Sequence, residues 1–267
     1  MAWYDVGNRR MNDTVLLRAE QLGFSFPDGR EIIRDLSFTL REHCFHVLIG
    51  PSGVGKSTLL KLCAGLLTEQ TGAFSFDEQS YDASRRLSKS VYMPQNDTLL
   101  PWRTVAENVN LTLELQGFVG EESSARTRDL LHAFGLTAFA NAFPQQLSGG
   151  MKQRTTFART MLKPVPLLLL DEPFSALDNL TRKEMQRWLL DVWHADKRTV
   201  LMVTHDIDEA LLLADYIYVW PDIPCSKLEP IDIQFERPRR YELVYERAFI
   251  ERKRMLETML LGGGGGL

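Results

Sequence analysis

Residues 50–57 read Gly50-Pro51-Ser52-Gly53-Val54-Gly55-Lys56-Ser57, and this stretch decides the fold that we expect for the whole chain. It lies between the apolar run 44–49, which predicts a short strand, and residues 56–67, whose apolar positions recur at helical spacing. Glycines let a chain turn so that successive backbone N–H groups point inward, and the N-terminus of the following helix attracts negative charge. This arrangement is typical of a phosphate cradle.

Three side chains at the start of the predicted helix complete this cradle. Lys56 would place a positive charge on the β and γ phosphates of a nucleotide, and Ser57 would present its hydroxyl to Mg²⁺. Thr58 can hydrogen-bond a neighbouring phosphate. A glycine-rich turn without a ligand is the alternative, but the flanking strand and helix favour the cradle. The stretch therefore predicts mononucleotide binding.

Strand and helix patterns alternate in the second half of the chain, which predicts an α/β fold with a parallel sheet wrapped by helices. The predicted strands are 167–170, 199–203 and 216–220, and the predicted helices begin at Gly150, Asn179 and Asp206.

The first half adds two further parts to this plan. Segments 15–22 and 32–40 are apolar-rich and flank the turn signal Pro27-Asp28-Gly29, so they predict an antiparallel β layer. Residues 97–146 carry apolar residues at helical intervals and predict a mostly helical insertion.

Two carboxylates follow the apolar strand 167–170 directly. Ligands of parallel sheets bind at the carboxyl ends of the strands, so Asp171 and Glu172 would lie beside the phosphates. Asp171 can hold Mg²⁺ through its water shell, and Glu172 can accept a proton from the water that attacks the γ phosphate. Solvated loop acids are the alternative, which the glycine loop disfavours.

Polar residues also follow two other apolar runs. His205 comes after the predicted strand 199–203 and could contact the γ phosphate, although a histidine at a strand end is often only a surface residue. Gln95 follows the short run 91–93 and by itself carries little information.

Residues 147–150, Leu147-Ser148-Gly149-Gly150, open the predicted helix that joins the helical insertion to the core. Ser148 is a good N-cap, which could be its whole role. Consecutive glycines at a helix start are costly, however, so they favour close approach of a ligand to this second anion site.

Together these motifs resemble the ATP-binding cassette ATPases. The glycine loop (Walker A), Leu-Ser-Gly-Gly and the acid-ended strand (Walker B) occur in that family's order, followed by residues 175–178 (Ser-Ala-Leu-Asp, the D loop) and His205. The resemblance covers residues 15 to about 220. It implies a P-loop NTPase fold, with a RecA-like core, an antiparallel β layer and a helical subdomain that carries the signature Leu-Ser-Gly-Gly.

The resemblance also implies that two subunits close head to tail around two ATP molecules, with Mg²⁺. Glu172 and His205 would be catalytic, and Ser57, Gln95 and Asp171 would serve the metal ion. The residues that would contact nucleotide across the two subunits are Phe26 (stacked on adenine), Gly50, Pro51, Ser52, Gly53, Val54, Gly55, Lys56, Ser57, Thr58, Gln95, Ser148, Gly149, Gly150 and Asp178.

Residues 99–105 (Leu-Leu-Pro-Trp-Arg-Thr-Val) and 205–211 (His-Asp-Ile-Asp-Glu-Ala-Leu) resemble the nitrate, sulfonate and taurine importer branch of the family. That branch also takes vitamin precursors and other small organic anions. The implied function is an importer ATPase that works with a second ATPase subunit, transmembrane permease subunits and, indirectly, a solute-binding protein. Gln95 would couple the metal ion to the permease.

Other classes of protein fit less well. A soluble cassette ATPase acting on nucleic acid or ribosomes would need a coiled-coil insertion or tandem cassettes. A P-loop GTPase or kinase switch would have no use for residues 147–150, and a GTPase would need a guanine-reading motif. A non-catalytic interaction subunit would not need its catalytic residues. Lys and Arg number 31 against 35 Asp and Glu, and the net charge of −4 disfavours nucleic acid as a partner.

The sequence gives no sign of a membrane span or of secretion. No apolar run approaches the roughly 18 residues that cross a bilayer, and residues 1–6 lack a basic segment followed by an apolar one. We expect a peripheral location on the cytoplasmic face of the membrane. The three cysteines have no metal-type spacing, and Cys63 fits a core position.

Two positions depart from the usual pattern of the family. His43 stands where the family usually has a glycine, and Thr155-Thr156 replaces a pair that is usually apolar. We expect residues 246–261 to form a solvated terminal helix, and the alternative is a helix that lies on the membrane surface.

We expect the chain to divide into four segments. These are the first part of the ATP-binding core (1–96), the helical subdomain (97–150), the second part of the core (151–221) and a C-terminal extension with a glycine tail (222–267).

Overall fold

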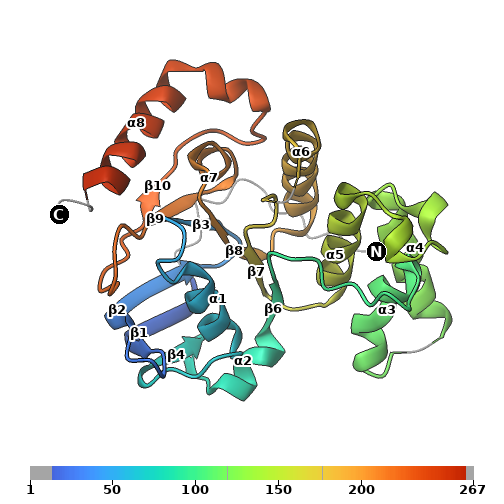
Figure 1. Cartoon of the computed structure of the whole chain (residues 1–267), viewed down its shortest axis with the longest axis horizontal. Helices are drawn as coiled ribbons and strands as arrows, with labels where there is room; N and C mark the ends of the chain where they lie inside the picture. The colour runs from blue at the N-terminus through green and yellow to red at the C-terminus, as the bar shows by residue number, and fades with distance from the viewer. Residues whose placement is uncertain (1–13, 119, 176, 263–267) are drawn as a thin grey trace.

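The computed structural model describes residues 14–118, 120–175 and 177–262 of the chain (Figure 1). Three predictions concern residues that lie wholly or partly outside these ranges: that residues 1–6 carry no secretion signal, that Ala176 belongs to the D loop, and that a glycine tail follows Gly262. Among the described residues, no helix combines the length and the apolar character needed to cross a bilayer.

A six-stranded sheet forms the centre of the molecule, in the order β10-β9-β3-β8-β7-β6. All its pairs are parallel except β10 with β9. Its middle strands are buried at every position, as the unbroken apolar runs of the sequence predict. The strands are β3 (Phe45–Ile49), β6 (Ser90–Met93), β7 (Leu167–Asp171), β8 (Thr199–Thr204), β9 (Tyr216–Val219) and β10 (Ile231–Asp232).

The register of the middle strands aligns their carboxyl ends. Ile49 of β3 lies opposite Thr204 of β8, and Val203 of β8 lies opposite Asp171 of β7. The glycine-rich loop after β3, the acid pair at the end of β7 and the segment after β8 therefore meet at one edge of the sheet.

A second, antiparallel sheet packs beside the first, in the order β2-β1-β4-β5. Its first two strands confirm the expected pair, and Phe26 N–H donates to Arg30 O across the turn at 2.9 Å. The sequence analysis did not identify the last two strands. The four are β1 (Val15–Ser25), β2 (Glu31–Arg41), β4 (Thr71–Phe76) and β5 (Gln79–Ser80).

Some helices cover the parallel sheet, and others form a separate group on one side. In Figure 1, α3 and α4 lie together at the right, away from the two sheets, and α5 lies between them and the parallel sheet. The segment boundaries at 96, 150 and 221 stay a prediction. The helices are α1 (Lys56–Ala64), α2 (Ala83–Lys89), α3 (Val105–Leu115), α4 (Glu121–Ala133), α5 (Gly149–Leu162), α6 (Asn179–Asp196), α7 (Ile207–Leu213) and α8 (Arg247–Gly262), with short turns η1 (Thr137–Phe139), η2 (Pro144–Gln146) and η3 (Tyr241–Tyr245).

Two helix boundaries differ from expectation for local reasons. The helix after the glycine-rich loop ends at Ala64 and not at residue 67, because Gly65 adopts a left-handed conformation (φ 78°) and caps it. Asp206 does not belong to α7 but caps its N-terminus, accepting from the N–H groups of Asp208 and Glu209.

Local geometry accounts for both departures from the family pattern. His43 has φ 57°, a conformation that favours glycine, and its ring nitrogen Nδ1 lies 2.8 Å from Lys197 O. The two buried hydroxyls of α5 donate to carbonyl oxygens one turn back, Thr155 to Met151 at 2.8 Å and Thr156 to Lys152 at 3.0 Å. They enter the core without an unpaired polar group. Cys63 is fully buried, as expected.

The C-terminal extension packs on the core. Phe249 and Leu256 of α8 are buried in the same cluster as the middle strands, and Phe249 stacks on Phe235 with ring centroids 5.8 Å apart. Buried Arg239 donates to carbonyl oxygens at the end of α7, at Leu211, Leu212 and Ala214. The terminal helix α8 is therefore partly buried, whereas the sequence analysis predicted a solvated helix.

This packing predicts that the extension contributes to global stability. Phe249→Ala should lower the free energy of unfolding by about 3–5 kcal/mol, because it leaves a cavity in the core. Ile250→Ala, a neighbour that is 40% exposed, is the matched control and should cost less than about 1 kcal/mol. Urea denaturation measures both, and equal losses would contradict the packing.

Candidate functional site

The glycine-rich loop needs its glycines for space and for backbone conformation. Gly53 and Gly55 have φ of 82° and 115°, values that side chains strongly disfavour. A Cβ at Gly55 would lie 2.2 Å from Ile32 Cγ2, and one at Gly50 would lie 2.4 Å from Trp220 O. The loop is thus packed tightly from behind, which fixes its curvature at the start of α1.

Lys56 lies folded over this loop. Its Nζ donates to the carbonyl oxygens of Gly50 at 2.8 Å and Pro51 at 2.7 Å. Burial lowers the pKa of Lys56, while the nearby carboxylates of Glu172 and Asp171 raise it. The structure therefore holds a buried cation between the loop and the acid pair, where an anionic ligand would be attracted.

The Asp171 carboxylate receives two hydroxyl hydrogen bonds. Ser57 Oγ donates to Oδ1 and Tyr92 Oη donates to Oδ2, each at 2.8 Å. Burial and the charge of Asp171 raise the pKa of the Tyr92 hydroxyl. The sequence analysis did not assign Tyr92, because a tyrosine on a short apolar strand indicates a polar partner without indicating which one.

These oxygen atoms suit Mg²⁺. The ion prefers oxygen ligands, keeps several waters and takes the remainder from one or two carboxylates and the phosphates of its nucleotide. The described residues contain no group of three or more His, Cys, Asp or Glu side chains that could hold a metal alone. One carboxylate and one hydroxyl at the end of the phosphate loop therefore fit an ion that arrives with a nucleotide.

Glu172 occupies a strained position at the end of β7. Its φ is 43°, and its N–H donates to Val203 O at 3.0 Å, so the backbone turns sharply after the strand. Its Oε2 lies 3.1 Å from His205 Nδ1 and accepts from Gln95 Nε2 at 3.3 Å. The structure thus brings the three residues together from three separate loops.

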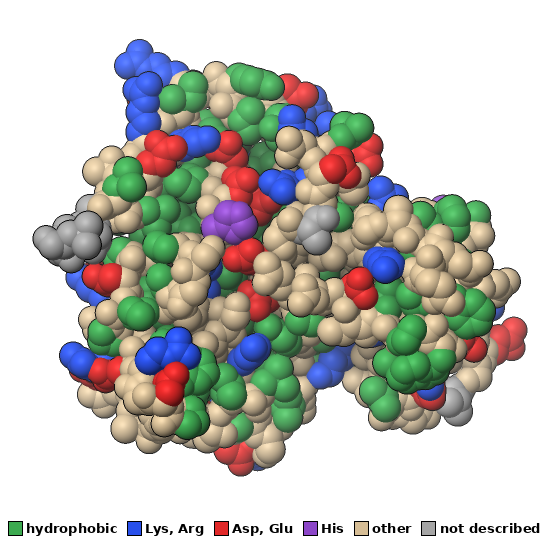
Figure 2. Space-filling model, viewed as in Figure 1, with side chains coloured by type: hydrophobic (Ala, Val, Ile, Leu, Met, Phe, Trp, Pro, Cys, Tyr) green, Lys and Arg blue, Asp and Glu red, His purple; other side chains and the backbone are tan. Residues whose placement is uncertain are grey.

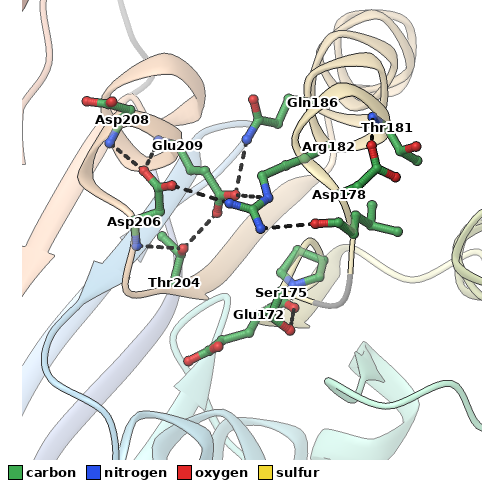
Figure 3. A network of polar contacts seen from close by, with 12 residues as sticks. Glu172, Ser175, Asp178, Thr181, Arg182, Gln186, Thr204, Asp206, Asp208 and Glu209 are labelled. Carbon is green, nitrogen blue, oxygen red and sulfur yellow. Dashed lines mark hydrogen bonds and ion pairs between the residues drawn. The ribbon is translucent and has the colours of Figure 1, made fainter. Parts of the chain in front are cut away.

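Figure 2 shows this region on the molecular surface: acidic side chains and a histidine lie together near the middle of the face, between the sheets and the helical group. Figure 3 shows a polar network beside it that the sequence analysis did not identify. Arg182 of α6 lies between the D loop and α7, close to Glu209. Only the tertiary structure brings these segments together.

Glu209 is 5% exposed, and burial raises its pKa to about 7. A hydrogen bond from Thr204 lowers the pKa, the charge of Asp206 raises it, and Arg182 and Gln186 lower it. The carboxyl group therefore changes charge near neutral pH.

The other predicted site residues contact their own helices within one chain. Ser148 Oγ caps its own helix by accepting from Met151 N–H at 3.3 Å. A Cβ at Gly150 would lie 2.7 Å from Thr181 Cγ2, so packing alone accounts for that glycine, whereas nothing lies within 4 Å of one at Gly149. Asp178 caps α6 through the N–H groups of Leu180 and Thr181.

Phe26 lies at the start of the turn between β1 and β2, half-buried beside the tighter-packed Phe24. The two rings meet edge to face with centroids 5.3 Å apart, and the Arg30 guanidinium lies 5.5 Å from the Phe26 centroid.

Comparison with known proteins supports the interpretation of the motifs. The family model described as ABC transporter matches residues 33–175. The chain is 39% identical to the formylaminopyrimidine import ATP-binding protein ThiZ of Halalkalibacterium halodurans, covering 85% of this chain and 88% of that protein. It is 41% identical to the taurine import ATP-binding protein TauB of Rhizobium johnstonii, covering 76% of each. The nitrate import ATP-binding protein NrtD of Synechococcus elongatus is 38% identical, with 88% and 87% covered.

Solved structures agree on the fold. CbiO1 of Clostridium perfringens, described as part of the transporter complex cbiONQ, superposes with a TM-score of 0.75 at 22% identity, covering 94% of this chain and 98% of that one. A dimeric ATP-binding cassette in a post-hydrolysis state, bound to ADP and phosphate, superposes with a TM-score of 0.71 at 27% identity, covering 83% and 100%.

The raised pKa of Glu209 predicts a pH-dependent stability. The folded protein binds this proton more tightly than the unfolded chain does, so the associated stability is present at low pH and is lost as pH rises through about 7. Between pH 5 and 7, the free energy of unfolding should fall by about 2 kcal/mol more in the wild type than in Glu209→Gln. Denaturation at several pH values measures this difference, and parallel curves would contradict it.

Proposed function

The chain belongs to the ABC transporter family, and we propose that it is the ATP-hydrolysing subunit of an importer, acting as a dimer with separate membrane-spanning permease subunits. The observation that carries the proposal is the convergence of Ser57, Asp171 and Glu172 beside the phosphate loop, while Ser148 lies on another helix with its side chain turned to its own backbone. We infer that one chain supplies the cradle and the base, and that a second chain supplies the second anion contact.

In the proposed reaction, the loop 50–58 binds the phosphates of ATP through backbone N–H groups and Lys56. Ser57 and Asp171, with Gln95 beside them, would hold Mg²⁺. Mg²⁺ held by these residues would supply positive charge that compensates the phosphates. Tyr92 keeps the Asp171 carboxylate in place through its hydrogen bond to Oδ2.

Glu172 acts as the general base in this scheme. It takes a proton from the water whose oxygen attacks the γ phosphorus, and the bond to the β–γ bridging oxygen breaks to give ADP and phosphate. His205, whose ring nitrogen lies 3.1 Å from Glu172 Oε2, is placed to orient the carboxylate and to contact the γ phosphate.

The second subunit completes the site. Ser148, Gly149 and Gly150 of a partner copy would contact the γ phosphate from the N-terminus of α5, where free N–H groups and the helix dipole favour an anion. Asp178 would lie at the interface between the copies, and Phe26 would stack on adenine. ATP binding would therefore close the dimer, and hydrolysis would reopen it.

The relatives suggest the class of cargo. Their names describe import of formylaminopyrimidine, taurine and nitrate, so we propose a small solute of this kind, an anion or a vitamin precursor, delivered by a solute-binding protein. The proposed location is the cytoplasmic face of the membrane, on the permease subunits. The named relatives disfavour a cassette ATPase without a transport role.

Glu172→Gln should retain ATP binding and lower the steady-state ATPase rate about 10²- to 10⁴-fold, because the general base is lost. Trapped with ATP, the variant should elute as a dimer in size-exclusion chromatography. Glu122→Gln, an exposed change on α4, is the control and should hydrolyse ATP normally. Undiminished hydrolysis by Glu172→Gln would refute the catalytic role.

Tyr92→Phe should raise the Mg²⁺ concentration needed for half-maximal ATPase activity by about 10-fold, because the Asp171 carboxylate loses one of its two hydroxyl donors. Binding of a fluorescent ATP analogue, titrated with Mg²⁺, should shift in parallel. Tyr81→Phe keeps an aromatic ring on which the side chain of Arg85 lies and serves as the control. An unchanged Mg²⁺ requirement in Tyr92→Phe would overturn the positioning role of this hydroxyl.

A further inference from the structure

Two loops of the proposed site have different tasks. The loop before α6 ends at Asp178, which would face the second subunit, and the loop before α7 carries His205 beside Glu172. In the proposed function the first loop responds to the partner and the second acts on the phosphate. A physical link between them would connect closure of the dimer to hydrolysis.

Arg182 provides such a link, as Figure 3 shows. Its Nη2 donates to Leu177 O at 3.1 Å, in the loop just before Asp178. On its other side, Nη1 lies 3.8 Å from Asp206 Oδ2, in the residue directly after His205. One guanidinium group on the first turns of α6 thus contacts both loops.

Glu209 anchors the other end of this link. Its Oε2 accepts from Thr204 Oγ1 at 2.7 Å, and its Oε1 accepts from Gln186 Nε2 at 3.1 Å and lies 3.9 Å from Arg182 Nε. Thr204 Oγ1 in turn accepts from Asp206 N–H at 3.0 Å. The residues on both sides of His205 are therefore held by one buried carboxyl group.

Burial of the Glu209 carboxyl group strengthens its contact with Arg182. A buried carboxylate without a charge partner is strongly destabilising, whereas an exposed ion pair contributes little. Glu209 is 5% exposed, and among the described residues Arg182 is the cation that lies beside it. Above about pH 7, where Glu209 is ionised, separating the two loops would thus leave a charge uncompensated inside the protein.

The network also adjoins the proposed catalytic pair. A cavity of about 10 Å³ is lined both by Glu172 and His205 and by Arg182 and Glu209. A displacement of Arg182 or Glu209 would therefore change the immediate surroundings of Glu172 and His205.

We propose that Arg182 is a positioning residue that couples the D loop to the segment carrying His205. The inference rests on the proposed function. Docking of a second subunit on Asp178 moves the loop that ends in Leu177, Arg182 follows its carbonyl, and the pull on Asp206 and Glu209 sets His205 against Glu172. At 3.8 and 3.9 Å the ionic contacts leave room to tighten as the dimer closes. Hydrolysis thereby depends on the partner's contact.

The kinetic test is Arg182→Met, which keeps the apolar stem and removes the guanidinium. The ATPase kcat should fall about tenfold or more while KM for ATP changes little, because positioning and not binding is lost. Arg187→Met, five residues further along the same helix and exposed, is the matched control and should leave both constants unchanged. An unchanged kcat in Arg182→Met would overturn the proposal.

A structural readout separates coupling from simple instability. In the Glu172→Gln background, ATP should form the dimer and slow hydrogen exchange both in residues 174–178 and in residues 204–209. Adding Arg182→Met should retain the dimer and the slowing in 174–178 but lose it in 204–209. Failure of ATP to form any dimer would refute the proposed function, whereas a dimer with both segments still slowed would refute only the coupling.

A second variant keeps this test informative if Arg182→Met destabilises the protein. At a pH well above 7, where Glu209 is ionised, Arg182→Met combined with Glu209→Gln removes the unpaired buried charge, so its melting temperature should recover toward that of the wild type. Its kcat should stay low, because the guanidinium link is still missing. Recovery of kcat together with stability would show that Arg182 acts only on stability and would overturn the proposal.

Discussion

Parallel pairing of β7, β8 and β3 is the constraint on which the site depends. These strands are buried along their whole length, so their registers are held by backbone hydrogen bonds and by packing on both faces. The pairing of Ile49 with Thr204 and of Asp171 with Val203 places the ends of three strands at one level. A slip of one residue would turn Asp171 toward the opposite face and separate it from Ser57.

Charge compensation at this edge follows from that alignment. Lys56 lies near two carboxylates, and Glu172 is held between Gln95 and His205 in a backbone conformation that is costly for a residue with a side chain. Such a turn persists only where its surroundings enforce it, here through the bond from Glu172 N–H to Val203 O. The same edge thus supplies the proposed phosphate cradle, the carboxylate proposed for a metal ion and the proposed base, while the Ser148 side chain caps its own helix.

Much of this could be predicted from local signals. The antiparallel pair, the strands around the glycine-rich loop and the start of α6 follow from apolar spacing and turn residues, and their observed limits differ by a few residues at most. Tyr92, Arg182 and Glu209 could not be found in this way. Each acts through a partner far along the chain, and an arginine on a helix or a tyrosine on a strand has many ordinary explanations.

The sequence by itself determined which groups are available for the proposed chemistry. The glycine-rich loop, the acid pair and the helix-opening Ser-Gly-Gly are short motifs whose function is local, because backbone conformation and residue type suffice for it. Only the tertiary structure decided which groups share a proton or a charge: the hydroxyl of Tyr92 on Asp171, the ring of His205 on Glu172 and the guanidinium of Arg182 between two loops. These contacts join residues that are distant along the chain and meet only through the order and register of the buried strands.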